Sequence, residues 1–282
     1  MNGAVLFLSA EYPPMHGGVG DYTGRLVEAL AAHDWDVHVL TSSTVHPADQ
    51  RVLPRVRRWN WDVANVAQQA LNETGARIVH IQSQTGAFKM HPAINFLPRR
   101  LRKKNPHLSW VTTFHDLLPP YLFPKAGLLR ERVTRILATN SDVSIATNER
   151  DLERLTIEHR LARRASMIPI GSNLPDIAAV DVQAMRTKIG IDNPEQIAIG
   201  FFGFLSEDKG VDMLLDALNQ RGWTQPTSLV IIGGGLSAAD VANRPYLTWI
   251  EERLKACPVQ VIETGYLPGV EAAAALRSMD LV

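Results

Sequence analysis

The sequence lacks the features that would mark a secreted or a membrane-spanning protein. Its single cysteine, Cys257, excludes a disulfide within the chain and a zinc cage built from cysteines. No apolar run approaches the roughly 18 residues that a membrane span needs. The apolar start of the chain has neither the basic residues nor the small-residue cleavage site of a signal peptide. We therefore expect a cytoplasmic protein.

An excess of charge of one sign is also missing, because 29 basic residues balance 29 acidic ones. The balance hides an asymmetry. Residues 1–172 carry 21 Lys and Arg against 15 Asp and Glu, whereas residues 173–282 carry 8 against 14. The asymmetry favours two domains, of which the first would face an anionic partner. Two solvated surfaces that merely differ in charge are the alternative.

Apolar runs of strand length alternate with segments of helical periodicity. In the first part, strands are expected at 4–9, 36–41, 78–81, 110–114, 143–146 and 167–170, and helices at 23–32, 62–72, 92–104, 128–138 and 150–161. After an irregular stretch, strands are expected at 197–205, 229–232 and 259–262 and helices at 211–220, 246–256 and 270–278, with another strand beginning at 280–282. This alternation predicts doubly wound parallel sheets. We expect domains at 1–172 and 196–282, joined by a linker at 173–195.

A glycine loop follows the first expected strand. Gly17, Gly18 and Gly20 lie in MHGGVGDY, just before the first helix. Glycines let a ligand approach the backbone closely, and a helix N-terminus attracts an anion. The loop therefore predicts a phosphate site, although a tight turn without a ligand explains the same residues.

His115 and Asp116 come directly after the strand 110–114. Ligands of parallel sheets bind at the carboxyl ends of the strands, so His115 is a candidate for contact with a sugar hydroxyl or a carbonyl. The neighbouring Asp116 could fix the tautomer of His115, but adjacent residues of an extended chain point in opposite directions. A structural histidine is the alternative.

Lys209 lies in a short loop between the strand 197–205 and the next helix. A cation is unfavourable at the positive end of a helix, and a bound diphosphate would remove the conflict. The loops with Gly203, with Gly233–Gly235 and with Gly265, Tyr266 and Leu267 each follow a strand of the second domain. Together they predict a nucleotide-binding edge.

Metal and nucleic-acid sites are not expected. The D-x-D pattern of Asp34 and Asp36 lies at the amino end of a strand, where it indicates a polar turn, and no other group has metal-ligand spacing. No aromatic-interleaved basic surface suggests nucleic acid. A basic run on and after the helix 92–104 is either a solvated helix end or a contact with an anionic membrane surface or acceptor; it comprises Arg99, Arg100, Arg102, Lys103 and Lys104.

Taken together, these stretches resemble the retaining GT-B glycosyltransferases of the group-4 family (glycosyltransferase group 1). The resemblance covers the whole chain, and the order of its motifs carries it: GGVGDY, TTFHD, IPIGSN, GFLSEDKGVDMLLDAL, VIIGGG, TGYL and SMDLV. It implies two Rossmann-like domains with a cleft between them. The first would hold a sugar or glycolipid acceptor, and the second a UDP-sugar or GDP-mannose donor.

The resemblance also implies roles for residues. Gly18 and Gly20 would approach the donor diphosphate, and His115 would contact the transferred sugar. Lys209 would stabilise the leaving diphosphate, while Gly234, Tyr266 and Leu267 would lie near the nucleoside. Transfer would proceed with retention and without a metal cofactor, in the synthesis of a surface polysaccharide or glycolipid. We expect this chain in the cytoplasm, peripheral to the inner face of the membrane if the basic run contacts a membrane surface.

Two departures from the family pattern bear on activity. Phe204 stands where the family commonly has an arginine. The paired glutamates and the closing helix of the family would follow Val282, so the resemblance implies a C-terminally truncated transferase with low turnover and an incomplete second domain. We expect the apolar face of 272–276 to lack packing partners there. A non-catalytic nucleotide-sugar-binding or scaffold protein and a GT-B nucleotide-sugar epimerase remain as alternatives.

Overall fold

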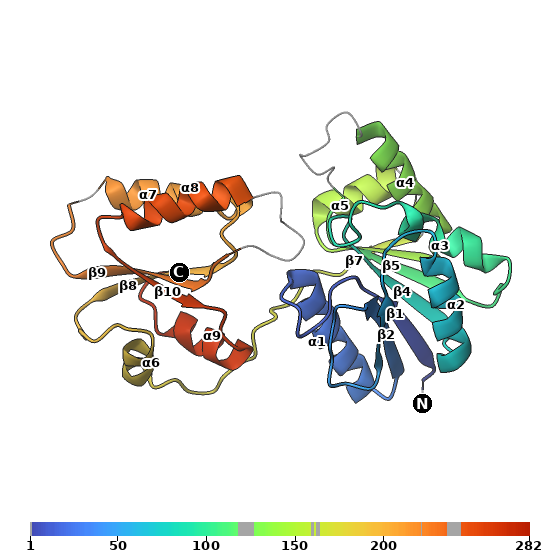
Figure 1. The fold of residues 1–282 in the computed structure, drawn as a ribbon, viewed down its shortest axis with the longest axis horizontal. Helices are drawn as coiled ribbons and strands as arrows, with labels where there is room; N and C mark the ends of the chain where they lie inside the picture. Colours follow the sequence, from blue (N-terminus) through green and yellow to red (C-terminus); the bar gives the residue numbers. More distant parts are fainter. Residues whose placement is uncertain (1, 118–126, 159–160, 162–163, 221, 236–243) are drawn as a thin grey trace. The chain divides into compact units, whose positions relative to one another are not determined.

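The computed structural model describes residues 2–117, 127–158, 161, 164–220, 222–235 and 244–282. The chain divides into two compact units, Met1–Gly171 and Ser172–Val282 (Figure 1). Among the described residues, no helix combines the length and the apolar character that crossing a membrane would require.

The first unit is built on a parallel sheet with the strand order β3-β2-β1-β4-β5-β6-β7. The strands are β1 (Ala4–Leu8), β2 (Asp36–Ser42), β3 (Val52–Val56), β4 (Ile78–Ser83), β5 (Ser109–Phe114), β6 (Val143–Ala146) and β7 (Ala165–Met167). The order reverses between β1 and β4, so the carboxyl ends of these two strands form the switch point at which such sheets bind ligands. The predicted doubly wound fold is confirmed.

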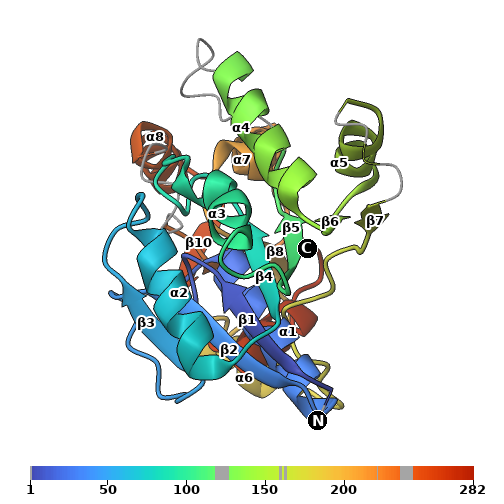
Figure 2. The ribbon, with the colours of Figure 1, turned by 90° about the vertical axis from the view of Figure 1, so that its right-hand side faces the viewer.

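Helices cover both faces of this sheet (Figures 1 and 2). They are α1 (Gly18–Ala32), α2 (Val63–Thr74), α3 (Ala93–Arg102), α4 (Gly127–Asn140) and α5 (Glu149–Glu153), which continues into a π-helical turn, Arg154–Glu158. Successive side chains of β1 alternate between the faces. Leu6 and Leu8 pack in the core that includes α2 and α3, whereas Val5 and Phe7 pack with Val27 of α1.

One strand of the first unit was not expected from the sequence. β3 contains Pro54, which cannot donate a hydrogen bond to a neighbouring strand. β3 lies at the end of the strand order and pairs with β2 alone, so the sheet tolerates the proline. β7 also begins and ends earlier than the predicted strand at 167–170.

The second unit has three parallel strands in the order β10-β9-β8. The strands are β8 (Ile197–Gly203), β9 (Thr227–Gly233) and β10 (Gln260–Gly265), and the helices are α6 (Val182–Lys188), the 3-10 turn Glu207–Lys209, α7 (Val211–Asn219), α8 (Arg244–Lys255) and α9 (Gly269–Arg277). α7 and α8 lie on one face of the sheet, and α6 and α9 on the other (Figure 1). Leu281 forms a parallel bridge to Ile199, where the sequence predicts the start of a further strand.

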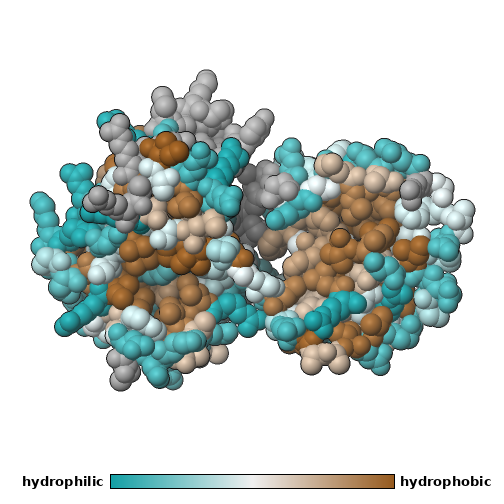
Figure 3. Space-filling view, turned by 180° about the vertical axis from the view of Figure 1, so that it is seen from behind, coloured by the Kyte–Doolittle hydropathy of each residue, from teal (hydrophilic) through white to brown (hydrophobic). Residues whose placement is uncertain are grey.

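Residues 173–195, predicted as a linker, are part of the second unit. Met185 and Ile191 are buried in its core together with Ala272 and Ala275 of α9. The expectation that the face of 272–276 lacks partners is therefore wrong, because the segment before β8 covers it. Figure 3 shows that the surface of this unit nevertheless presents a broad band of apolar residues.

Arg186 of α6 fastens the end of the chain to this core. Its side chain is almost fully buried and donates hydrogen bonds to the carbonyl oxygen of Ser278 at 2.8 Å and to Asp280 at 2.7 Å. The same oxygen of Asp280 accepts a hydrogen bond from the backbone N–H of Ala198 at the start of β8. α6 and α9 thus hold the two ends of the second unit together.

Candidate functional site

The carboxyl edge of the first sheet brings together residues that are far apart in sequence. The chain leaves β1 toward Glu11 and the glycine loop, β4 ends with Gln82 and Ser83, and β5 delivers His115. Because all these strands are parallel, the residues after them share one edge. The edge lies at the topological switch point of the sheet.

His115 is held by a partner that the sequence analysis did not identify. Its Nε2 lies 2.8 Å from Oε1 of Gln82, and the ring of Tyr22 packs edge-on against the imidazole at 5.0 Å. Burial lowers the pKa of His115 to about 4. The imidazole is therefore neutral at pH 7, with Nε2–H donating to Gln82 and Nδ1 left as an acceptor. The hydrogen bond to Gln82 fixes the tautomer.

A second neutral histidine lies beside the first. Nε2 of His80 is 2.8 Å from Oγ1 of Thr113, and its ring centroid is 4.8 Å from that of Phe7. Burial and the neighbouring His115 lower the pKa of His80 to about 3. His80 is a structural group of the core, and it keeps positive charge away from the edge.

The glycines of the loop before α1 serve different purposes. A Cβ on Gly17 would lie 2.2 Å from Oε2 of Glu11, and one on Gly20 would lie 3.1 Å from the backbone nitrogen of Tyr12. These two glycines pack closely against Glu11 and Tyr12. A Cβ on Gly18 would meet nothing within 4 Å. Of these three glycines, only Gly18 lies in the first turn of α1 with open space beside its Cα atom.

Glu11 is the functional candidate that the sequence analysis missed. Its side chain is only 4% exposed, and burial raises the pKa of its carboxyl group above the usual range. The charge of Lys89 partly offsets this effect, and Asp21 reinforces it. A carboxylate two residues beyond a strand as apolar as AVLFLS was the available signal, since a charge is rarely placed there without a purpose.

The second unit has its own glycine-rich edge. Gly203, Gly233, Gly234 and Gly235 all have φ between 68° and 121°, which other residues rarely adopt. The backbone N–H of Gly234 donates to the carbonyl oxygen of Gly203 at 2.8 Å, and that of Leu205 donates to the carbonyl oxygen of Gly235 at 3.0 Å. The loops after β8 and β9 are thus joined through their backbones.

The remaining predicted residues of this unit lie beside that edge. Lys209 is exposed in the 3-10 turn just before α7. Gly265 ends β10 with φ 66°, Tyr266 is 61% exposed, and Leu267 packs at the margin of the core that includes α9. The structure therefore brings the second-unit candidates together at one sheet edge, as it does those of the first unit.

A metal site finds no support in the part of the chain that the structure describes, where no three His, Cys, Asp or Glu residues gather suitably. The D-x-D pattern begins with Asp34, whose φ of 62° marks a turn. Asp36 pairs with His38 at 3.0 Å. The pattern is a polar connection to β2.

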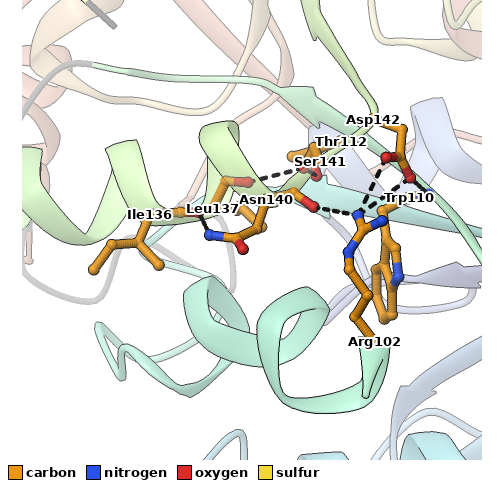
Figure 4. A network of polar contacts seen from close by, with 8 residues as sticks. All are labelled: Arg102, Trp110, Thr112, Ile136, Leu137, Asn140, Ser141 and Asp142. Atoms are coloured by element: carbon orange, nitrogen blue, oxygen red, sulfur yellow. Dashed lines mark hydrogen bonds and ion pairs between the residues drawn. The ribbon is translucent and has the colours of Figure 1, made fainter. Parts of the chain in front are cut away.

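Part of the basic run on α3 is structural. Arg102 donates to the carbonyl oxygen of Asn140 at the end of α4 and pairs with Asp142, which also accepts from the backbone N–H of Trp110 (Figure 4). Arg100 donates to the carbonyl oxygen of Trp61 and lies over its ring at 5.6 Å. Arg99, Lys103 and Lys104 are exposed. Their exposure is compatible with a solvated surface and with an anionic partner.

Solved structures share this fold at low sequence identity. The Anabaena protein Alr3699/HepE in complex with UDP and glucose is 19% identical with a TM-score of 0.70, covering 99% of this chain and 73% of that one. Sucrose-phosphate synthase from Thermosynechococcus elongatus is 19% identical with a TM-score of 0.67, covering 98% and 73%. The catalytic domain of starch synthase IV from Arabidopsis thaliana is 12% identical with a TM-score of 0.63, covering 99% and 77%. The chain has the α/β fold of the GT-B glycosyltransferases.

Comparison with curated proteins finds no matching sequence. The family model described as glycosyl transferase 4-like domain matches residues 17–171, from the glycine loop to the end of the first unit. The match spans more than half of the 282 residues. It includes α1 with its glycine loop, Gln82 and His115. The chain therefore belongs to the glycosyl transferase 4-like family.

Proposed function

We propose that this protein transfers a sugar, with retention of configuration, from a nucleoside diphosphate sugar to a hydroxyl group of a saccharide or glycolipid. The observation that carries the proposal is that one chain carries two candidate edges, one on each unit. The first unit presents a neutral histidine fixed by Gln82, and the second presents joined glycine loops beside Lys209. A UDP-sugar is the preferred donor, because UDP and UDP-glucose complexes occur among the proteins of similar fold.

In this proposal, the second unit binds the nucleotide. Gly203 and Gly234 let the nucleoside approach the backbone, with Tyr266 and Leu267 beside it. Lys209 pairs with the diphosphate and stabilises the negative charge that grows as the nucleotide leaves. Gly18, with its open space at the start of α1, supplies a backbone N–H toward the same diphosphate. None of these steps uses a metal.

His115 would contact the transferred sugar. As a neutral imidazole held by Gln82, it presents Nδ1 as an acceptor for one sugar hydroxyl. A neutral group at this place suits a donor whose oxocarbenium-like transition state carries positive charge, because an imidazolium would oppose that charge. The donor phosphate would serve as the base for the attacking hydroxyl.

Calorimetric titration with UDP-glucose, UDP and GDP-mannose tests the donor assignment. Wild-type protein should bind the UDP ligands, and Lys209→Ala should weaken that binding about 10-fold, the size of a charge-assisted contact. Lys188→Ala is the matched control, since Lys188 forms a surface ion pair with Glu271 in the same unit. Folded protein that binds no nucleotide would contradict the proposal.

A non-catalytic binding protein is the second candidate, and Phe204 favours it. Phe204 offers no charge to a diphosphate. Slow release of UDP from bound UDP-glucose would separate the candidates, because a binding protein would leave the donor intact. Binding without release, in a folded sample supplied with a range of hydroxyl acceptors, would favour the second candidate.

We also propose that α3 contacts an anionic membrane surface on the cytoplasmic side. Replacing Arg99, Lys103 and Lys104 with glutamate should abolish most binding to vesicles that contain anionic phosphatidylserine, because each basic residue near such a surface contributes about 1 kcal/mol. Sedimentation with vesicles measures the effect, and neutral phosphatidylcholine vesicles are the control. Equal sedimentation of variant and wild type would contradict this contact.

A further inference from the structure

Glu11 is held under the glycine loop by close packing. Its Oε2 lies where a side chain on Gly17 would begin, and its Cδ is 2.8 Å from the same position. A side chain at residue 17 would displace the Glu11 carboxylate, which occupies that space. The carboxylate is a built-in part of the sheet edge.

The burial of Glu11 is unfavourable for the fold. Desolvation is the largest influence on the pKa of its carboxyl group, and the charge of Lys89 opposes it while that of Asp21 adds to it. Taking a carboxylate out of water costs free energy. Such groups are typical of functional sites, where stability and activity oppose each other.

Other groups at the same edge are unsatisfied or strained. Gln82 is 1% exposed, and its Nε2 has no hydrogen-bond partner among the described residues while Oε1 is engaged by His115. Lys89 and Met90, in the loop after β4, have φ of 52° and 64°, and such left-handed residues store strain that clusters at ligand sites. The edge thus offers one strong acceptor, the Glu11 carboxylate, and two donors, the Gln82 amide and the Lys89 ammonium.

This combination fits hydroxyl groups better than phosphate. A hydroxyl both donates and accepts, so neighbouring hydroxyls of a sugar ring can use the carboxylate and the donors together. A phosphate only accepts, and the carboxylate would repel it. The chemistry under Gly17 therefore selects a polyhydroxyl ligand.

We propose that Glu11 binds the donor sugar, its carboxylate accepting hydrogen bonds from two adjacent ring hydroxyls while Gln82 and Lys89 donate beside it. This inference rests on the proposed function, because it assigns the sugar half of a nucleotide sugar to this edge. It makes Glu11 a determinant of sugar specificity, and it limits the diphosphate contact of the glycine loop to Gly18.

The variant Glu11→Gln tests the assignment, because it keeps the shape and removes the charge. In calorimetric titrations, Glu11→Gln should bind UDP-glucose at least about 10-fold more weakly than wild type while its affinity for UDP is unchanged. Glu28→Gln is the matched control, since Glu28 is an exposed glutamate of α1, and it should alter neither affinity. Thermal unfolding should show Glu11→Gln to be at least as stable as wild type. If Glu11 had a structural role, the variant would instead be less stable than wild type.

Each other outcome has a definite meaning. Unchanged affinity of Glu11→Gln for UDP-glucose overturns the proposal, and so does an equal loss for UDP and UDP-glucose. The proposal is also overturned if wild-type protein binds UDP-glucose no more tightly than it binds UDP. Absence of all nucleotide binding instead removes the proposed function. If Glu11→Gln does not fold, Glu11→Asp, which keeps the charge but withdraws it, should lose UDP-glucose affinity selectively.

Discussion

Acidification from pH 7 to pH 5 is expected to reduce the stability of the first unit by about 4 kcal/mol, about 2 kcal/mol from each of two buried histidines. The reason is that His80 and His115 remain neutral in the folded unit, where burial lowers their pKa values from 6.5 to about 3 and about 4. In the unfolded chain both histidines take up protons near pH 6.5. Stability is therefore fully present above pH 6.5 and falls as the pH drops below it.

Urea unfolding at the two pH values measures this effect. His80→Gln should reduce the loss of stability between pH 7 and pH 5 by about 2 kcal/mol. This is the free energy that one buried histidine contributes over about 1.5 pH units, because only the unfolded chain takes up its proton. His107→Gln, at an exposed position, is the matched control and should leave the loss unchanged. Glu11 and Asp21 act in the opposite sense, because their raised pKa values favour the folded unit as the pH falls. A pH dependence identical in His80→Gln and wild type would contradict the prediction.

Replacing Trp110 with alanine should destabilise the first unit by about 4 kcal/mol, because it removes a large side chain from a packed core. Trp110 is fully buried in β5 and packs among the core side chains on the α2 and α3 side of the sheet. Its Nε1 has no hydrogen-bond partner among the described residues, so Trp110→Phe should cost much less. The comparison of alanine with phenylalanine separates packing from the indole N–H.

Urea unfolding followed by circular dichroism measures the loss. Trp61→Ala is the matched control, since Trp61 is 46% exposed and should lose about 1 kcal/mol or less. Trp110 also lies at the start of the strand that delivers His115, so hydrogen exchange of β5 should rise in Trp110→Ala. Similar losses for the two alanine variants would show that Trp110 does not anchor the core.

The fold could be predicted from the sequence because alternating strands and helices are local patterns. Segments such as AVLFLS and WVTTF show their burial without any knowledge of their neighbours. β3 escaped because Pro54 contradicts the local signal, and only its edge position in the sheet makes it acceptable. Residues 173–195 escaped because their packing on α9 joins segments about 90 residues apart in sequence.

The candidate site was predictable in part for the same reason. The glycine loop, His115 and Lys209 stand at strand ends, where a local pattern points to them. Gln82 and Glu11 act through long-range neighbours, His115 and Gly17, and no local pattern reveals these contacts. Sequence reasoning found the strand ends, and the pairing of strands decided which side chains meet there.

The joined loops after β8 and β9 bear on how the second unit could be redesigned or could evolve. The joined loops form a wall of backbone atoms from Gly203 and Gly233–Gly235. Backbone atoms offer the same hydrogen-bonding groups whatever the neighbouring side chains are, so substitutions at neighbouring positions leave this wall unaltered. A Cβ on Gly233 would lie 3.0 Å from the carbonyl oxygen of Gly203, which bars most replacements there. Libraries aimed at new nucleotide preferences should therefore keep Gly203 and Gly233–Gly235 constant. They should vary Phe204 and Tyr266, which directly follow Gly203 and Gly265 in the sequence.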